Sequence, residues 1–421
     1  MSNRPTGAAI TPIALLASVG QCASLCLSLT LARQLDVAGF EAYVVASAVY
    51  MVMLVVGTMG VDKLAMYVLP ASIDREDWST THGFLRFGVR RIGLSSFVLA
   101  LVVISAISLI SEVSVEIRAA IIVSCLILPV GALVHFGIEV MTSAGREIIA
   151  TAILRVLMPA TTLVIVGLCA WQGSISGPGA ILVWGVSWMF AGAVLASLLG
   201  RRLPTEIWAS EPRDEAELWI GYAYPFLVHR GILALLTHSG VILLDFLYAS
   251  PTAVGAYAIS LAIITPMASV VIATNRAYVR AMSVLAKAGD TEGIFELWKR
   301  RARWVLPVLT CFTVMVLLLA RPLVGLFGEE FVEEGVTPLR IFAVTMAISA
   351  TFSLSPTYLK FTRQRSKVLK IAVATAIVQF GLLLALVPLW GATGAAIASG
   401  TSLSAMVCIC TLIVLREVSA R

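Results

Sequence analysis

Long apolar segments alternate with short polar connections along almost the whole chain. Each segment has about 20 residues or more, enough to cross the ~30 Å hydrocarbon core of a bilayer as a helix. The connections at 70–91, 201–218 and 279–303 are the long ones. The pattern predicts an all-α polytopic membrane protein with twelve transmembrane helices, at approximately 9–32, 42–69, 92–111, 118–140, 147–170, 180–200, 219–248, 254–278, 304–327, 336–359, 367–389 and 392–415.

The composition supports a membrane protein. Of the 421 residues, 59% are hydrophobic and 13% are charged, and the mean hydropathy is +0.96. A soluble enzyme is excluded. The seven cysteines lie inside apolar segments and form no CxxC motif, so we expect them to be packing residues rather than disulfides or metal ligands. We expect no cofactor, no metal and no catalytic residue.

Basic residues gather in alternate connections. They are frequent at 70–91, 201–218, 279–303 and 360–370, whereas the intervening connections contain the acidic run 329–334. The positive-inside rule then places both termini in the cytoplasm of a cell (inner) membrane protein, in agreement with an even number of spans. The net charge of +6 therefore reflects topology, and we expect no nucleic-acid partner.

Eight of the nine tryptophans lie at or near the ends of the expected spans. Trp188 alone falls a turn or two inside its segment. Tryptophan is enriched at membrane–water interfaces, so we interpret the eight as interfacial anchors rather than as groups that stack on a ligand.

The most polar stretch falls at the midpoint of the chain. It predicts an N-terminal six-helix lobe at 1–202, a cytoplasmic linker at 203–218 and a C-terminal six-helix lobe at 219–421. A weak internal repeat supports two pseudo-symmetric lobes, because FEAYVVASAVY (40–50) resembles VGAYAISLAII (254–264). Repeats of one orientation are a known transporter plan, with the binding site between the repeats. We therefore expect a central cavity.

The segment 219–248 carries charges that a lipid-facing helix would not tolerate. On a helical wheel, Arg230, Asp245 and His238 fall within an arc of about 80°. Arg230 lies about 15 Å in from Ile220, near the middle of the hydrocarbon core. A charge there costs at least ~2.5–3.5 kcal/mol unless it faces protein or water. The segment is therefore expected to line the cavity.

Other ionisable residues lie within the expected spans. Arg155 is either a cationic wall residue or an arginine that snorkels to the cytoplasmic face, in a helix that Pro159 is expected to bend. Asp62 is either half of a local ion pair or a protonatable coupling acid. Its counterpart under the repeat is Arg276. A helix-end ion pair is expected to account for His135 and Glu139.

These residues form the predicted site. His238 has two interpretations, a proton relay or a hydrogen-bonded structural histidine. The ion-coupling candidates are Asp62 and Asp245. The candidates for substrate binding are Lys63, Arg155, Arg230, Arg276 and His238.

Several stretches resemble the polysaccharide transporter (oligosaccharide flippase) family of the multidrug/oligosaccharidyl-lipid/polysaccharide exporter superfamily. They are LTLARQLDVAGFEAYVVASAVYMVMLVVGTMGVDKLAMYVLP (29–70), ILLDFLYASPTAVGAYAIS (242–260), PLVGLFGEEF (322–331) and PLWGATGAAIASGTS (388–402). The match is one of pattern, and this chain has RQLDVAG where RxLG is commoner. The resemblance implies two lobes in a V around a cavity. It also implies alternating access that moves a polyprenyl-pyrophosphate-linked oligosaccharide to the outer leaflet for polysaccharide biosynthesis.

The charges fit such a cargo, because basic side chains offset the desolvation of a pyrophosphate. The other expected partners are membrane lipids and a coupling ion, H⁺ or Na⁺. A drug/cation antiporter of the same superfamily is the alternative, although its cavity should be rich in carboxylates. A membrane enzyme acting on lipid-linked sugars would need a larger extracytoplasmic loop and paired carboxylates, which the sequence lacks.

Overall fold

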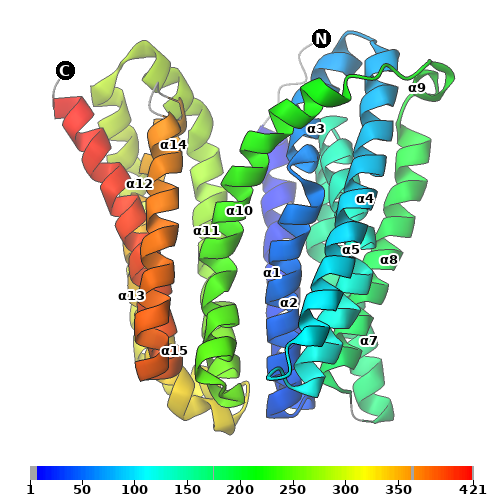
Figure 1. Ribbon diagram of the computed structural model, residues 1–421. Coiled ribbons are helices and arrows are strands. Elements are labelled where there is room, and N and C mark those ends of the chain that lie inside the picture. The colour runs from blue at the N-terminus through cyan, green and yellow to red at the C-terminus, as the bar shows by residue number, and fades with distance from the viewer. Residues whose placement is uncertain (1–6, 174, 362–364, 420–421) are drawn as a thin grey trace. The chain divides into compact units, whose positions relative to one another are not determined.

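A computed structural model describes residues 7–173, 175–361 and 365–419 of the chain, and these residues are helical almost throughout, with no strand (Figure 1). The α-helices are α1 (Gly7–Gln34), α2 (Val37–Thr58), α3 (Val61–Asp74), α4 (Trp78–Leu109), α5 (Val115–Ser143), α6 (Glu147–Ala152), α7 (Met158–Gln172), α8 (Gly177–Arg202), α9 (Glu206–Ala209), α10 (Ala216–Tyr248), α11 (Pro251–Ala288), α12 (Thr291–Gly325), α13 (Val332–Phe352), α14 (Leu354–Phe361) and α15 (Arg365–Ser419). A π-helical turn, η1 (Ile153–Leu157), joins α6 to α7, and the 3₁₀ turn η2 (Glu329–Phe331) precedes α13.

Eleven helical stretches of the described residues are long and apolar enough to cross a membrane. The last of them, Ser366–Arg416, has 51 residues, about 76 Å of helix and more than twice the hydrocarbon thickness. Gly391 breaks it with φ 51° and ψ −128°. A Cβ on Gly394 would lie 2.2 Å from the carbonyl oxygen of Leu386, so the chain folds back on itself there. The stretch contains two spans, and the prediction of twelve is confirmed.

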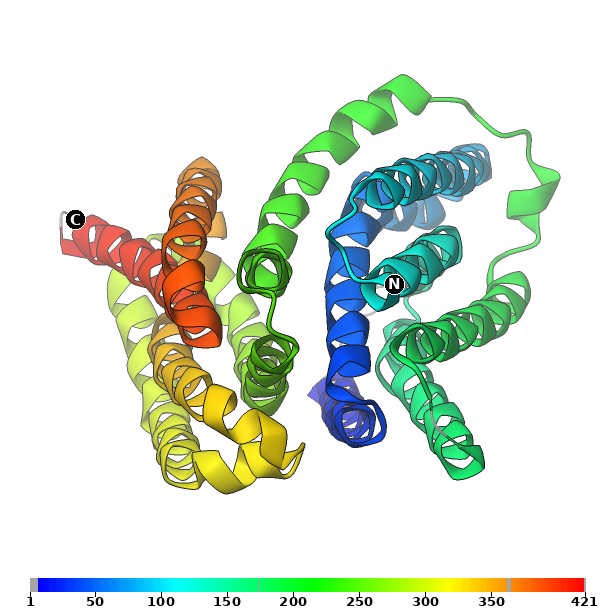
Figure 2. The ribbon, with the colours of Figure 1, turned by 60° about the horizontal axis from the view of Figure 1, so that its bottom comes forward.

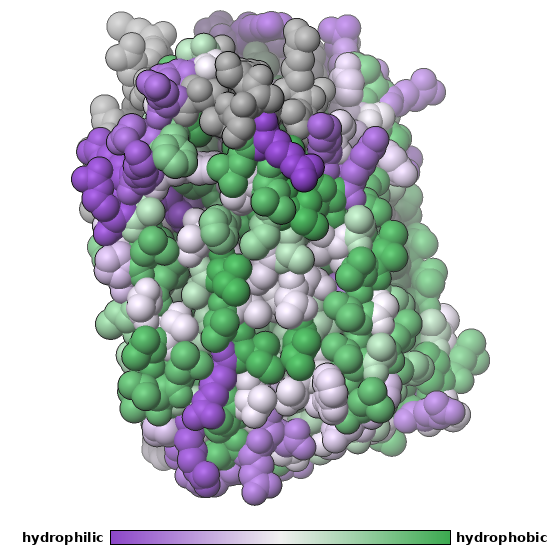
Figure 3. Space-filling view, turned by 90° about the vertical axis from the view of Figure 1, so that its left-hand side faces the viewer, coloured by the Kyte–Doolittle hydropathy of each residue, from purple (hydrophilic) through white to green (hydrophobic). Residues whose placement is uncertain are grey.

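Hydrophobic side chains also cover the surface. On the face drawn in Figure 3 they form a broad band, and hydrophilic residues gather toward its two ends. Exposed apolar residues are numerous in the span helices, as on α4 at Leu94, Phe97, Leu101 and Val102. A surface of this kind belongs in lipid, so the chain is a multi-pass membrane protein.

The chain divides into two compact units, Met1–Ala234 and Leu235–Arg421. The boundary falls inside α10, beyond the polar linker at 203–218. The first half of α10 thus packs with the preceding helices, because Trp219 lies against Phe84 and Phe87 with ring centroids 5.4 and 5.2 Å apart. Trp219 is fully buried, and its interpretation as an interfacial anchor is wrong.

Helix α5 lies at the centre of unit 1. It packs against α2, α3, α4 and α8, and Figure 2 shows it enclosed by α2, α4 and α8. Tyr50 of α2 is fully buried against Trp184 and Trp188 of α8, with centroid distances of 4.7 and 6.2 Å. Trp184 is another buried tryptophan that the sequence pattern placed at an interface.

Unit 2 is organised around α13, which packs against α11, α12 and α15. Hydroxyl contacts join helices of this unit, including Ser349 of α13 with Ser404 of α15 (3.1 Å) and Ser355 of α14 with Thr411 of α15 (2.8 Å). Buried hydroxyls that hydrogen-bond between helices are a common way of joining membrane helices.

Three spans that the sequence pattern showed as continuous are interrupted. The segment 42–69 breaks between α2 and α3, 147–170 contains the π-turn η1, and 336–359 breaks at Ser353 between α13 and α14. The distortion expected from Pro159 in fact precedes that proline, which stands in the first turn of α7. Irregular backbone at membrane depth is tolerated where protein or a cavity covers it.

Candidate functional site

The break between α2 and α3 creates a buried helix start. Met59 and Gly60 both have left-handed backbone, with φ of 51° and 75°. No side chain caps α3 at Gly60, and Asp62 stands in its first turn, where the helix dipole favours a negative charge. A Cβ on Gly60 would lie 2.4 Å from the carbonyl oxygen of Ala223. Helix α10 therefore lies directly on the break.

The same face of α10 supplies a partner for the acid. Arg230 follows Ala223 by seven residues, two helical turns, and its guanidinium donates a hydrogen bond to Oδ2 of Asp62. The Asp62 side chain is 0% exposed and that of Arg230 is 25% exposed. Oδ1 of Asp62 has no hydrogen-bond partner among the described residues. Of the two interpretations of Asp62, the local ion pair is present, and the second carboxylate oxygen is buried.

A second ion pair adjoins the first. Lys63 donates from Nζ to Oε1 of Glu139 on α5. One turn earlier on α5, His135 stacks on Trp188 with ring centroids 5.2 Å apart. The helix-end ion pair expected near these residues thus joins Glu139 to Lys63, while His135 packs on an aromatic ring.

Arg155 reaches this region from the π-turn. A Cβ on Gly20 of α1 would lie 1.9 Å from the Arg155 carbonyl oxygen, so α1 and η1 make very close backbone contact. π-turns inside α-helices are frequent at functional sites. The charges of Asp62, Lys63, Arg155 and Arg230 all act on the imidazole of His135.

We call these six residues the unit-1 polar cluster. Its members are Asp62, Lys63, His135, Glu139, Arg155 and Arg230. It contains three cationic side chains and two carboxylates. The cluster therefore has a surplus of positive charge, and Arg155 is exposed. Such a site can bind an anion, and its carboxylates can bind a proton or a cation. No group of residues that could hold a metal ion occurs within the described ranges.

The remaining predicted site residues belong to unit 2. His238 and Asp245 lie in the second half of α10, two turns apart, and both are partly buried. Arg276 falls in α11, and its side chain lies outside the described residues. Gln379 of α15 donates to the carbonyl of Leu236 (2.8 Å) and to Oγ of Ser239 (3.2 Å).

Sequence reasoning missed one buried basic residue. Arg301 was counted among the topological arginines, yet it is 3% exposed. It donates to the carbonyls of Ala350 (3.0 Å) and Thr351 (3.2 Å) and to Oγ of Ser353 (3.0 Å). These acceptors lie at the end of α13, where carbonyls lack helical partners. The clue in the sequence was the serine-rich, proline-containing segment 349–356.

Comparison with known proteins shows the fold. No family model matches the chain, and no curated protein matches it. Solved structures do match over nearly their full length. An inward-facing multidrug resistance MATE family transporter of the MOP superfamily has a TM-score of 0.78 at 13% identity, covering 97% of this chain and 98% of that one. The chain has the fold of these transporters.

Two further structures agree. One is a MOP superfamily transporter from Pyrococcus furiosus. Its binding pocket is described as having reverse polarity, which suggests a different function for that protein. Its TM-score is 0.69 at 12% identity, covering 98% of this chain and 95% of that one. The other is a MATE transporter from Vibrio cholerae, with a TM-score of 0.66 at 15% identity, covering 98% and 97%. All three confirm the two-lobed all-α architecture.

Proposed function

We propose that this protein is an exporter of the MOP superfamily, and specifically a flippase for a polyprenyl-pyrophosphate-linked oligosaccharide in polysaccharide biosynthesis. It works by alternating access in the cell membrane, with both termini in the cytoplasm. The observation that carries the proposal is the surplus of cations in the unit-1 polar cluster, where Arg230 is held by a buried carboxylate yet keeps part of its side chain exposed.

The exposed part of each cation is what a pyrophosphate would contact. Arg230 and Lys63 keep 25% and 32% of their side chains exposed, whereas their carboxylate partners keep 0% and 12%. The cluster thus presents its positive groups and buries its negative ones. Guanidinium groups match phosphate oxygens in bidentate geometry. Arg276 and His238 complete the proposed substrate-binding set in unit 2.

Arg230 would be shared between the cargo and Asp62. An anion on Arg230 competes with Asp62 for the guanidinium, so binding of the cargo loosens the pair and gives Asp62 a role in coupling. Asp245 in unit 2 is the second ion-coupling candidate, for H⁺ or Na⁺.

A multidrug/cation antiporter is the alternative function. The carboxylate of Asp62 inside a membrane helix favours it, because a carboxylate is what a cationic drug would bind. The multidrug description of the first structural relative points the same way, while the reverse polarity described for the Pyrococcus protein is a precedent for a different cargo on this fold.

Lipid analysis separates the two functions. Cells lacking the protein are extracted and their lipids are measured by mass spectrometry, beside a drug-susceptibility panel. The flippase proposal predicts accumulated polyprenyl-pyrophosphate oligosaccharide, whose mass identifies the glycan, and unchanged susceptibility. Unchanged lipids with heightened sensitivity to cationic drugs would establish the alternative.

Substitution of Arg230 tests the site. Arg230→Ala should abolish export at unchanged abundance, and Arg230→Lys should restore part of it, since a lysine retains the charge without the planar fork. Lys299→Ala is the control, because Lys299 is an exposed cation that pairs with Glu296 at the surface. Full export by the alanine variant would remove Arg230 from the binding site.

A further inference from the structure

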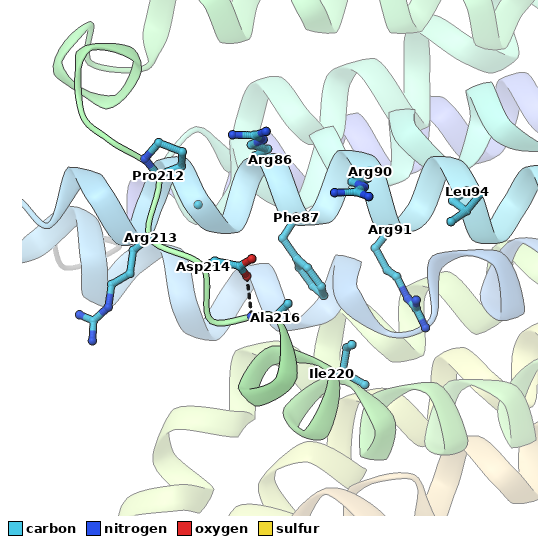
Figure 4. Close-up of a pocket in the computed structure, with 11 residues that line it drawn as sticks. Arg86, Phe87, Arg90, Arg91, Leu94, Pro212, Arg213, Asp214, Ala216 and Ile220 are labelled. Carbon is cyan, nitrogen blue, oxygen red and sulfur yellow. Dashed lines mark hydrogen bonds between the residues drawn. The ribbon is translucent and has the colours of Figure 1, made fainter.

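A basic pocket lies in unit 1 between α4 and the start of α10, apart from the polar cluster. It encloses about 380 Å³. Figure 4 shows Phe87 and Arg91 pointing from α4 toward Ile220 of α10. The lining is Gly83, Arg86, Phe87, Arg90, Arg91, Leu94, Pro212, Arg213, Asp214, Ala216 and Ile220.

The chain between α9 and α10 forms one wall, and it is fixed in place. The backbone N–H of Arg213 donates to the carbonyl of Ser79 (3.1 Å), and Nδ1 of His82 donates to the carbonyl of Ser210 (2.8 Å). A Cβ on Gly83 would lie 1.9 Å from the Arg213 carbonyl oxygen, so only a glycine lets this wall approach α4 so closely. The fold therefore fixes this wall of the pocket.

The positive charges of the pocket are only partly balanced. Arg86, Arg90 and Arg91 form no ion pair with any carboxylate of the described residues. Arg86 and Arg90 stand one helical turn apart, a spacing at which like charges repel. Asp214 is the acid in the lining, and it accepts a hydrogen bond from the N–H of Ala216 at the start of α10 (3.0 Å). An anion in the pocket would relieve the repulsion.

The other side of the lining is apolar and continues into the lipid-facing surface. Leu94 is 56% exposed and Ile220 is 40% exposed. One turn further along α4, Val98 is exposed too. A free phosphate ion makes no favourable contact with an apolar surface. A phospholipid does, because its anionic headgroup is joined to acyl chains. Basic pockets between membrane helices on the cytoplasmic side are known to bind anionic headgroups.

We propose that this pocket binds the phosphate headgroup of an anionic phospholipid, with an acyl chain lying along Leu94 and Val98. The phosphate lies among Arg86, Arg90 and Arg91 of the lining, whose positive charges attract it. Topology alone requires basic residues on this side of the membrane, but it does not require them to line a pocket with an apolar exit. This lipid stays bound to the protein and is not the transported cargo.

Two matched arginine pairs test the proposal. Arg90 and Arg91 line the pocket, and Arg201 and Arg202 form an exposed pair at the end of α8 outside it. The full-length protein is purified in neutral detergent, and binding of phosphatidylglycerol or phosphatidylcholine is measured by native mass spectrometry. We expect one phosphatidylglycerol per chain, weakened about tenfold or more in R90Q/R91Q and unchanged in R201Q/R202Q.

A third variant moves affinity in the opposite direction. Asp214→Asn keeps an oxygen for the Ala216 N–H but removes the negative charge, so phosphatidylglycerol should bind more tightly. Equal losses in both arginine pairs would show a general charge effect and overturn the proposal. Equal binding of phosphatidylcholine, or displacement of the lipid by inorganic pyrophosphate at similar concentration, would also overturn it. None of these results requires a change in export, so the lipid-binding experiment and the export experiment test the two proposals independently.

Discussion

Each unit contains an arginine whose charge is neutralised inside the helix bundle, and the two are neutralised in different ways. Arg230 in unit 1 pairs with a buried carboxylate. Arg301 in unit 2 donates to two backbone carbonyls and a hydroxyl at the end of α13. The first partner is a carboxylate that carries a charge of its own, whereas the carbonyls and the hydroxyl around Arg301 carry none. The comparison teaches that burial alone does not identify a charged residue as functional. The chemistry of its partner is the better indicator.

Loss of Arg301 should have the largest effect. Arg301→Ala removes the donor to the Thr351 carbonyl and one of several donors to the Ala350 carbonyl and the Ser353 hydroxyl. Hydrogen bonds from a charged group contribute ~1.5–3 kcal/mol each, and loss of the packed side chain leaves a cavity. We expect a destabilisation of about 3–5 kcal/mol, measured as a large drop in melting temperature in detergent, equal at pH 5 and pH 8. A strong pH dependence would show that Arg301 has a titratable partner, and the contrast between the two arginines would fail.

Loss of Arg230 should cost less and should be repairable. Arg230→Met leaves Asp62 buried without a counter-charge, which costs ~3–5 kcal/mol for a fully buried pair; partial exposure of Arg230 reduces this to about 2 kcal/mol. The double variant Arg230→Met/Asp62→Asn should recover most of the stability while remaining inactive in export. Thermal unfolding of the single and double variants gives the coupling energy. Additive losses would contradict a direct pair.

The helix break should be needed to hold the pair together. Gly60→Ala places a Cβ 2.4 Å from the Ala223 carbonyl oxygen, at a positive φ of 75°. We expect a cost of about 1–3 kcal/mol and reduced export, because α10 must shift and Arg230 moves with it. Gly221→Ala is the control, since a Cβ there meets nothing within 4 Å. If the two substitutions reduced export equally, export would not depend on the close packing of α10 against Gly60.

The smallest effect is expected at a partly exposed helix cap. Asp77 precedes α4 and accepts hydrogen bonds from the backbone N–H and the hydroxyl of Thr80 (3.1 and 2.8 Å), and these bonds lower the pKa of the Asp77 carboxyl. A lowered pKa gives stability that is present above the ordinary value of about 4 and is lost as pH falls through the lowered value. Asp77→Ala should cost about 1 kcal/mol at pH 7, with a smaller difference near pH 3 by thermal unfolding.

Much of the fold was predictable because membrane helices must be long and apolar. The spans and the two-lobed plan followed from hydropathy and the linker position. The helix breaks could not be predicted in this way. Met59 and Gly60 lie in a continuous apolar segment, and the reason for the break is the packing of α10 against it. The burial of Trp184 and Trp219 was missed for a similar reason: both lie near span ends, but inside the helix bundle.

The site was partly predictable. Asp62 and Arg230 stood out as charges in apolar segments, and an ion pair was one of the interpretations considered for Asp62. Their pairing with each other could not be derived, since it depends on which helix covers the break. Arg301 was missed because positive-inside counting treats every arginine near a basic connection alike, regardless of the direction in which its side chain points.

The Asp62–Arg230 pair joins residues that are 168 positions apart. The chain is synthesised from its N-terminus at ~5–20 residues per second, so Asp62 is synthesised about 8–34 s before Arg230. During that interval the Asp62–Arg230 pair cannot form, and α3 has to stay in place without it. Completion of the N-terminal unit therefore waits for the seventh span, and a chain truncated before α10 should be a substrate for membrane quality control.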